Sequence, residues 1–336
     1  MTNLLEPWVL LRIVAGLVAF LLFARGAITA QKVLRHFDVA KATEGQLALE
    51  KRMELASTFV RIGAVVQVLS LVLSALASDR LSRGVRGAMC AYGVFGANEW
   101  GFRSLAATVV VALLAGVLTQ VLAFDARVRG FDLVRPIAIA TLAMAPLSAI
   151  DLAFVYEYLS RLDLTVVASC CSVQLDPIAA GGPTFAGGPR VIATAVAVIG
   201  TVVSIAAALF AARAPTERRV VIAAFATLLT VPAAVAASVL EVAPHAFEVP
   251  QHVCPFCLLR SDVFAIGYPL YGALFLATVW AGGVAACALL SSGDTLLAFA
   301  RQKLRRGAFA WGVALVLGAI PVVRFAIVSG GASLFP

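Results

Sequence analysis

The chain has 336 residues, of which 62% are hydrophobic and only 13% are charged, and its mean hydropathy is +0.98. Soluble domains are nearer half apolar and a quarter charged, so these apolar residues exceed what one globular core can bury. The formal net charge of +8 comes from short basic clusters between apolar runs. That arrangement is typical of membrane topology and argues against a nucleic-acid partner. The composition therefore predicts an integral membrane protein whose main partner is the lipid bilayer.

Several apolar runs are long enough to cross a bilayer. Inside lipid each run must form a helix, because a helix pairs its own backbone polar groups. The sequence therefore predicts an all-α, polytopic membrane helix bundle of about eight transmembrane helices. No basic residue precedes the first run, so we expect a retained helix rather than a cleaved signal. The predicted spans are 8–30, 56–78, 104–124, 136–158, 190–212, 219–241, 263–290 and 308–329.

The distribution of Lys and Arg predicts the orientation. One set of alternate connections holds 15 of the 26 basic residues, and the other set holds 7. The richer set should be cytoplasmic, which puts both termini on the periplasmic side. The high Ala and Val content favours the bacterial inner membrane. We expect the mixed-charge segment 31–55 to form a cytoplasmic helix between the first two spans, as a solvated connector or as a docking site for a partner.

Five of the six cysteines fall in connections that are predicted to lie outside the cytoplasm. That compartment is oxidising in bacteria, so exposed thiols there form disulfides or bind metals. Five is odd, so at least one thiol lacks an intrachain partner within this set. The sequence is compatible both with structural disulfides and with reactive thiols. The five are Cys90, Cys170, Cys171, Cys254 and Cys257, whereas Cys287 lies in the seventh span as a packing residue.

The spacing of these cysteines favours reactivity. Cys254-Pro-Phe-Cys257 is a C-x-x-C motif that we expect at a helix start, where the helix dipole can lower a thiol pKa. The adjacent Cys170 and Cys171 can close only a strained ring, or they can offer two thiolates to a partner. His245 and His252 share the loop of the motif, so a Cu or Zn site is an alternative.

A short similarity indicates an internal duplication. The segment 89–95 resembles 253–259 at an offset of 164 residues, which is close to half the chain. We therefore predict an N-terminal four-helix half, 1–165, and a C-terminal four-helix half, 166–336, as parallel repeats within one membrane unit. Cys90 and Cys254 would then occupy equivalent positions.

The stretch from Cys254 to Arg260, followed by an apolar span, resembles the DsbB-type disulfide-generating oxidases and, more distantly, the vitamin K epoxide reductase-like proteins. The resemblance implies a helix bundle whose C-x-x-C exchanges electrons with a quinone. Cys254 and Cys257 would be the pair nearest the quinone, and Arg260 would lie beside it. Cys170 and Cys171, or Cys90, would be the shuttle to a periplasmic thiol protein.

Four ionisable residues fall inside predicted spans at similar depth. Charges in lipid are costly, so they are usually paired or functional. We expect Asp151 or Glu157 to pair with Arg12 or Arg324 and thereby to link the two halves.

The sequence thus predicts a membrane thiol–disulfide oxidoreductase or redox relay that acts on the periplasmic face. A transporter or metal-handling permease with an outer Cys/His site is one alternative. A non-catalytic membrane subunit, stapled by disulfides and bound to partners in a larger complex, is another.

Overall fold

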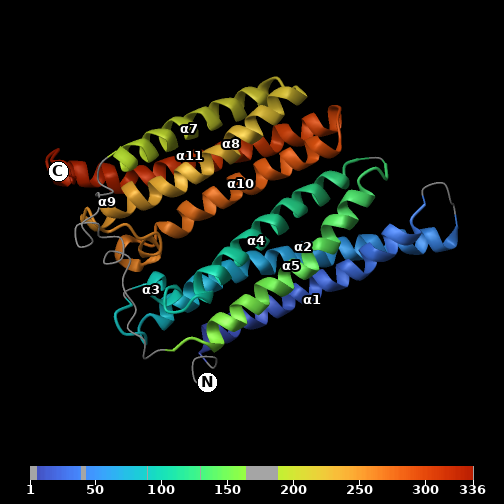
Figure 1. Cartoon of the computed structure of the whole chain (residues 1–336). Coiled ribbons are helices and arrows are strands. Elements are labelled where there is room, and N and C mark those ends of the chain that lie inside the picture. The colour runs from blue at the N-terminus through green and yellow to red at the C-terminus, as the bar shows by residue number, and fades with distance from the viewer. Residues whose placement is uncertain (1–5, 39–42, 89, 129, 164–187, 336) are drawn as a thin grey trace. The chain divides into compact units, whose positions relative to one another are not determined.

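The computed structural model describes residues 6–38, 43–88, 90–128, 130–163 and 188–335, and the regular elements of these residues are helical (Figure 1). Eight of the helices are long and apolar enough to cross a membrane. The predicted eight-span bundle is therefore confirmed. The long helices are α1 (Pro7–His36), α2 (Glu44–Leu81), α4 (Trp100–Asp125), α5 (Val134–Ser160), α7 (Gly188–Arg213), α8 (Glu217–Ala237), α10 (Gly267–Leu290) and α11 (Asp294–Val328).

The described residues also form five short elements. They are α3 (Ala91–Phe95), the π-helical turn η2 (Ser238–Val242), α9 (Ala243–Phe247), and the 3₁₀ turns η3 (Cys257–Leu259) and η4 (Ser261–Val263). The turn η2 and α9 continue α8, so that Glu217–Phe247 counts as one span.

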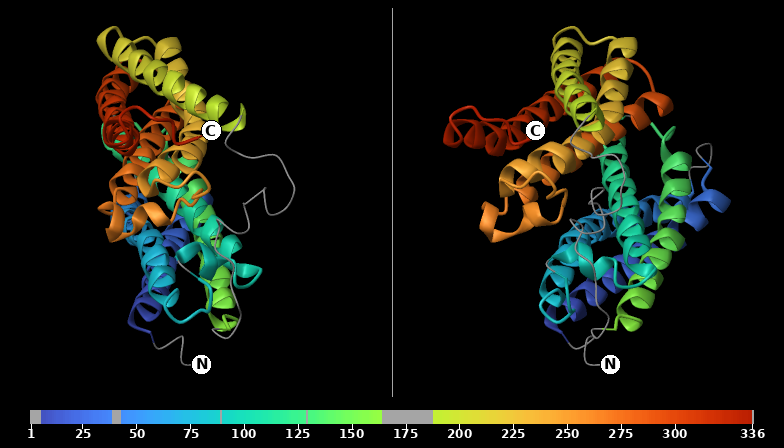
Figure 2. Two further views of the ribbon diagram at one scale, coloured as in Figure 1. Left: turned by 90° about the vertical axis from the view of Figure 1, so that its left-hand side faces the viewer. Right: turned by 60° about the vertical axis from the view of Figure 1, so that its left-hand side comes forward.

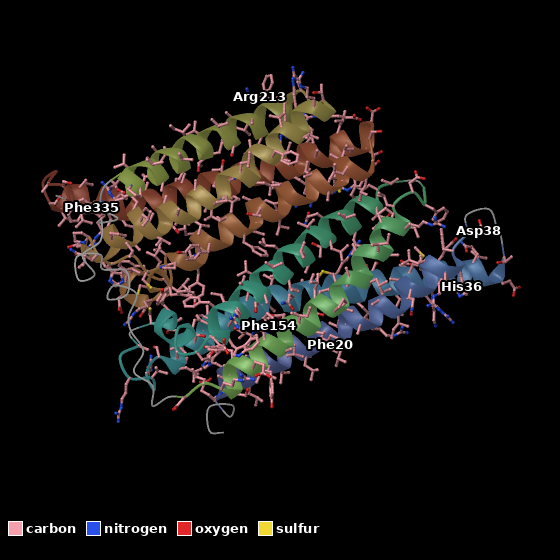
Figure 3. All side chains as sticks on the ribbon, in the orientation of Figure 1. Phe20, His36, Asp38, Phe154, Arg213 and Phe335 are labelled. Atoms are coloured by element: carbon pink, nitrogen blue, oxygen red, sulfur yellow. The ribbon has the colours of Figure 1, made fainter. Side chains whose placement is uncertain are left out.

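The prediction of a separate helix over 31–55 is wrong. Helix α1 continues to His36, and α2 already begins at Glu44, where the hydroxyl of Thr43 accepts a hydrogen bond from Gln46 N at 3.4 Å. Figure 3 shows His36 and Asp38 at this end of α1. Hydropathy detects only the apolar part of a helix. Capping residues and helix propensity determine where a helix ends, and these ends can lie in charged sequence outside the lipid.

The described residues form two compact units. The first unit contains α1, α2, α4 and α5, and the second contains α7, α8, α10 and α11 together with residues 87, 88 and 90–93 (Figure 2). The domain boundary near residue 165 and the internal repeat stay predictions.

Small residues let the helices of the first unit approach closely. A Cβ on Gly26 of α1 would lie 2.8 Å from the side chain of Val60 in α2. Next to this contact, Phe23, Val60 and Met144 belong to one buried apolar cluster that joins α1, α2, α4 and α5. Such contacts are the usual source of helix association in lipid, where no hydrophobic driving force acts between helices.

A buried ion pair lies inside the first unit, between α1 and α5. Arg12 Nη2 is 3.1 Å from Asp151 Oδ2, and each side chain is only 1% exposed. Thr108 and Gln67 also donate hydrogen bonds to this carboxylate, at 2.5 and 2.9 Å. Arg12 Nε donates to Ser74 Oγ at 2.6 Å. The predicted pairing of Asp151 with Arg12 is confirmed.

The expectation that such a pair links the two halves is wrong. Arg12 and Asp151 both belong to the first unit. Glu157 instead pairs with Arg161 one helical turn later, at 2.6 Å, and Arg324 pairs with Glu248, at 3.3 Å, within the second unit. Each charge has a partner within its own unit, so none is needed from the other half.

The second unit has a core of α10 and α11 residues around Trp311, with Leu258 of η3 buried against it. Figure 3 shows Arg213 at the end of α7 and Phe335 beyond α11. The extra residue of the π turn η2 directs Ser238 and Glu241 inward, and both are buried. Single π turns inside helices often mark functional positions.

We expect Asp151→Leu to destabilise the protein by about 3–5 kcal/mol, because it leaves the buried Arg12 guanidinium without its counter-ion. The double variant Arg12→Met/Asp151→Leu should be less destabilised than the single one, since no charge is then left unpaired. Unfolding in detergent measures both.

The exposed pair Glu99–Arg103, with side chains 62% and 55% exposed, provides the control. Its disruption by Glu99→Gln should cost about 0–1 kcal/mol. Equal effects of Asp151→Leu and Glu99→Gln would contradict the role given to the buried pair.

Candidate functional site: a buried cluster of three thiols

Three of the predicted site cysteines lie together within the second unit. The Sγ atoms of Cys90, Cys254 and Cys257 are all within 4.8 Å of one another, and those of Cys90 and Cys254 are 3.5 Å apart. The three residues are 0–2% exposed. A disulfide needs about 2.0 Å between its sulfurs, so these are thiols in contact. Small side-chain movements would be enough to join any two of them.

Local turns give the C-x-x-C segment its shape. Arg260 N donates to Cys257 O at 3.1 Å and closes the 3₁₀ turn η3. Two residues with left-handed backbone follow, Phe264 at φ 58° and Ala265 at φ 51°, and they turn the chain back toward α10. At Gly267, the first residue of α10, an added Cβ would lie 2.8 Å from the backbone of Leu258. Glycine is required here because the helix begins directly against the turn.

Tyr271 fastens the motif to α10. Its hydroxyl donates to the carbonyl of Pro255, between the two cysteines, at 3.2 Å. The Tyr271 hydroxyl also lies 3.4 Å from Ser238 Oγ in the π turn η2. Sequence reasoning missed these residues. Tyr271 is one turn after Gly267 on the same helix face, so the spacing pointed to it, but no local signal connects Ser238 with the motif.

Aromatic side chains surround the thiols. Tyr92, Phe247 and Phe256 pack against the cluster. The ring of His252 stacks on Phe247, with centroids 4.1 Å apart and planes 19° apart. The Nε2 atom of His252 is buried and has no hydrogen-bond partner among the residues that the structure describes. Burial, and to a smaller extent the nearby Arg260, lower the pKa of His252, while Cys90 opposes this shift.

The position of the motif differs from the one expected. The C-x-x-C was predicted at a helix start, but α10 begins at Gly267, ten residues after Cys257, and only a 3₁₀ turn begins at the cysteine itself. The expected lowering of a thiol pKa by a helix dipole is therefore wrong. Hydrogen bonds with Cys254 and Cys90, followed by burial, raise the pKa of Cys257. The physical reason is that neighbouring thiols in a dry site cannot all become anions.

The remaining predicted site residues lie elsewhere or cannot be placed. Arg260 pairs with Asp262 at 3.0 Å and is partly exposed. His245 is 2.8 Å from Glu241 O through Nδ1, and its ring lies against Phe325 and Phe335. Cys170 and Cys171 lie outside the described residues.

A cavity of about 230 Å³ lies among the helices of the second unit. Its walls come from α7, α8, η2, α10 and α11, and they are mostly apolar. Ser238 and Trp311 belong to the lining, and the indole Nε1 of Trp311 has no hydrogen-bond partner within the described part of the chain. Since Ser238 contacts Tyr271, which binds the Pro255 carbonyl, a short polar chain connects the cavity wall with the C-x-x-C segment.

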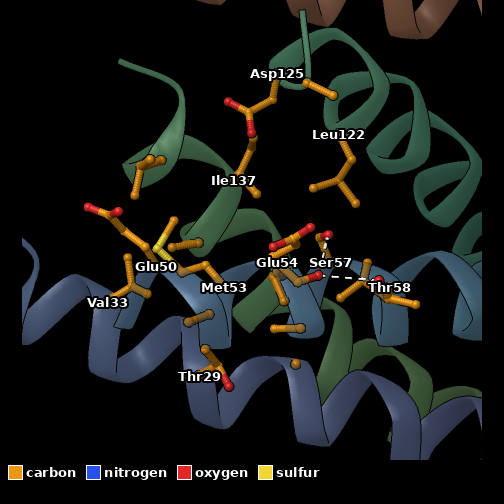
Figure 4. A pocket seen from close by; sticks show the side chains of 18 of the residues that line it. Thr29, Val33, Glu50, Met53, Glu54, Ser57, Thr58, Leu122, Asp125 and Ile137 are labelled. Carbon is orange, nitrogen blue, oxygen red and sulfur yellow. Dashed lines mark hydrogen bonds between the residues drawn. The ribbon is translucent and has the colours of Figure 1, made fainter. Parts of the chain in front are cut away.

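The first unit contains a separate cavity of about 480 Å³, near the ends of α1, α2, α4 and α5 (Figure 4). Glu50, Glu54 and Asp125 line it together with Arg61 and apolar side chains. It contains no thiol and does not contribute to the cysteine site.

No protein-family model, no curated protein and no solved structure matches this chain.

We expect His252 to remain neutral at pH values where an ordinary histidine is already protonated, that is, below about 6.5. Burial lowers its pKa, so the charged form requires more acid. An NMR titration of chelator-treated, histidine-labelled protein measures the midpoint, and His252→Gln assigns the signal. A midpoint at or above the ordinary value would show that the ring is solvated.

Proposed function

We propose that the protein is a membrane thiol–disulfide relay that works at the periplasmic end of its helices. The observation that supports this proposal is the contact of three buried thiols, Cys90, Cys254 and Cys257, all within 4.8 Å. Thiol–disulfide exchange needs an attacking thiolate beside a disulfide. A group of three cysteines supplies both, because two can be bonded while the third remains a thiol.

The internal step is an isomerisation. Starting from a Cys254–Cys257 disulfide, the thiolate of Cys90 attacks Cys254 Sγ, the Cys254–Cys257 bond breaks, and the Cys257 thiolate leaves. No electron is gained or lost. The 3.5 Å contact between Cys90 and Cys254 makes Cys254 the sulfur that is shared by both bonded states.

Net turnover needs a dithiol donor and an oxidant. A partner protein would give two electrons and two protons as it becomes a disulfide. A quinone would take them as it becomes a quinol and restores the Cys254–Cys257 disulfide. The quinone follows from the resemblance to DsbB-type oxidases, and the apolar cavity next to Ser238 is a suitable place for it. The cavity is smaller than the roughly 300–1,000 Å³ of typical ligand pockets, so it suits a single ring better than a large ligand.

Burial imposes a further requirement. With exposures of 0–2%, the three thiols are out of reach of another protein's cysteine. A more accessible pair must pass the disulfide outward, and the adjacent Cys170 and Cys171 are the cysteines proposed for this shuttle.

The main test follows the redox state of the thiols in the purified protein. After reduction and re-oxidation by a quinone analogue, differential alkylation should show the C-x-x-C thiols cycling. Cys254→Ser should reduce this cycling to background, whereas Cys287→Ser, at an equally buried cysteine in α10, should leave it unchanged. Cycling that survives in Cys254→Ser would refute the relay and favour structural cysteines.

The shuttle has a separate test. Cys170→Ser/Cys171→Ser should stop the oxidation of a protein dithiol, because a protein cannot reach the buried cluster. Oxidation of a small dithiol such as dithiothreitol should continue, since a small molecule can enter. Equal loss with both substrates would show that the pair does not act as a shuttle.

A further inference from the structure

The same three sulfurs have the separation of a metal site. Zinc binds thiolate sulfur at about 2.3 Å, which puts the sulfurs of a tetrahedral site about 3.8 Å apart. The Sγ atoms of Cys90 and Cys254 are 3.5 Å apart, and all three sulfurs fall within 4.8 Å of one another. Small rotations of the side chains would bring them to the required spacing. The sulfurs come from two separate segments of the chain, so their proximity results from the fold and not from closeness in the sequence.

A fourth donor lies in the same loop. His252 comes two residues before Cys254, and its Nε2 atom is buried without a hydrogen-bond partner among the described residues. The stacking on Phe247 holds the ring in place, with centroids 4.1 Å apart. A buried nitrogen without a hydrogen-bond partner costs free energy. His252 interacts electrostatically with Cys90, but the three sulfurs form the 4.8 Å group without it, so a side-chain rotation must bring Nε2 to a metal ion held by the sulfurs. His245, which was predicted to share this loop, lies in α9 instead, and its Nδ1 is 2.8 Å from Glu241 O.

The surroundings also favour a cation. The apolar side chains packed around the sulfurs are the aromatic residues Tyr92, Phe247 and Phe256. Thiolates in such a site need a positive charge among them, and a bound metal ion is the most compact source. Three thiolates and one imidazole are a common ligand set of tetrahedral zinc.

We propose that Cys90, Cys254, Cys257 and His252 form a Cys₃His binding site for Zn²⁺ in the reduced protein. Metal binding and disulfide formation then exclude each other, because each requires the same sulfur lone pairs. If the proposed relay is correct, zinc holds the protein in its reduced, inactive form. The site itself does not depend on that relay.

The test uses the full-length protein, reduced, purified in detergent and freed of metal. Titration with Zn²⁺ against a chelating dye should give one ion per chain, and Co²⁺ should produce the absorption of a tetrahedral thiolate site. Cys90→Ser and Cys254→Ser should each lower the zinc affinity by at least about tenfold, because even the loss of a residue that only orients a ligand costs roughly 10–100-fold. Cys287→Ser is the matched control and should bind as the wild type does.

The histidine assignment has its own matched pair. His252→Gln should lower the affinity by at least about tenfold, whereas His245→Gln should not change it. Equal affinities of these two variants would refute His252 as a ligand. Tight Cu⁺ binding without Zn²⁺ binding would also overturn the four-ligand site, because Cu⁺ is satisfied by sulfur ligands alone.

A measurement on the wild type guards against variants that fail to fold. Zn²⁺ should slow the alkylation of Cys90, Cys254 and Cys257, read by mass spectrometry, and leave that of Cys287 unchanged. No protection, together with no stoichiometric binding, would refute the zinc site. Disulfide cycling measured in excess chelator tests the relay separately, so either proposal can fail without the other.

Discussion

The solvent around the helices determines the rest of the structure. In hydrocarbon, a polar group without a partner costs several kcal/mol, so the backbone crosses only as helices. Charged side chains inside the spans obey the same rule. Arg12 and Asp151 satisfy each other with help from Thr108 and Gln67, and Arg190 pairs with Glu241 in the second unit. These charged groups pair with one another and hold helices together. The candidate reactive groups, the three clustered thiols, lie in the connections instead.

The connection between α9 and α10 shows how irregular backbone can hold a site. Its polar groups are paired locally, as in the bond from Ala265 N to Arg260 O at 2.9 Å and that from Val249 N to Pro244 O at 3.1 Å. Tyr271 then fixes the turn to a membrane helix. A regular helix spreads its side chains around its axis, whereas a compact turn can gather two cysteines against a third from another segment.

Burial gives the cluster both of the properties proposed for it. It keeps the thiols out of contact with solvent and adds to the hydrogen bonds with Cys254 and Cys90 that raise the pKa of Cys257, which disfavours the thiolate. A disulfide removes the repulsion between neighbouring thiolates by bonding two of the sulfurs. A metal ion offsets the same repulsion with its positive charge. The proposed redox relay and the proposed zinc site would therefore meet the same electrostatic requirement in two ways, and the redox state would select between them.

The amino-acid sequence by itself determined the number and approximate place of the membrane helices, because run length and hydropathy are properties of each segment alone. It also separated Cys287, in a span, from Cys254 and Cys257 in a connection. It included Arg12 and Asp151 among four ionisable residues but left open which of them pair. It did not show that α1 continues to His36 and that α2 begins at Glu44, since capping acts beyond the apolar window.

Only the tertiary structure decided which groups meet. It placed Cys90 beside Cys254 across 164 residues of chain, selected His252 rather than His245 as the imidazole near the thiols, and brought Tyr271 and Ser238 to the motif. Such contacts depend on how helices pack and where their ends come together. Local sequence patterns do not predict these contacts, because packing depends on several segments at once.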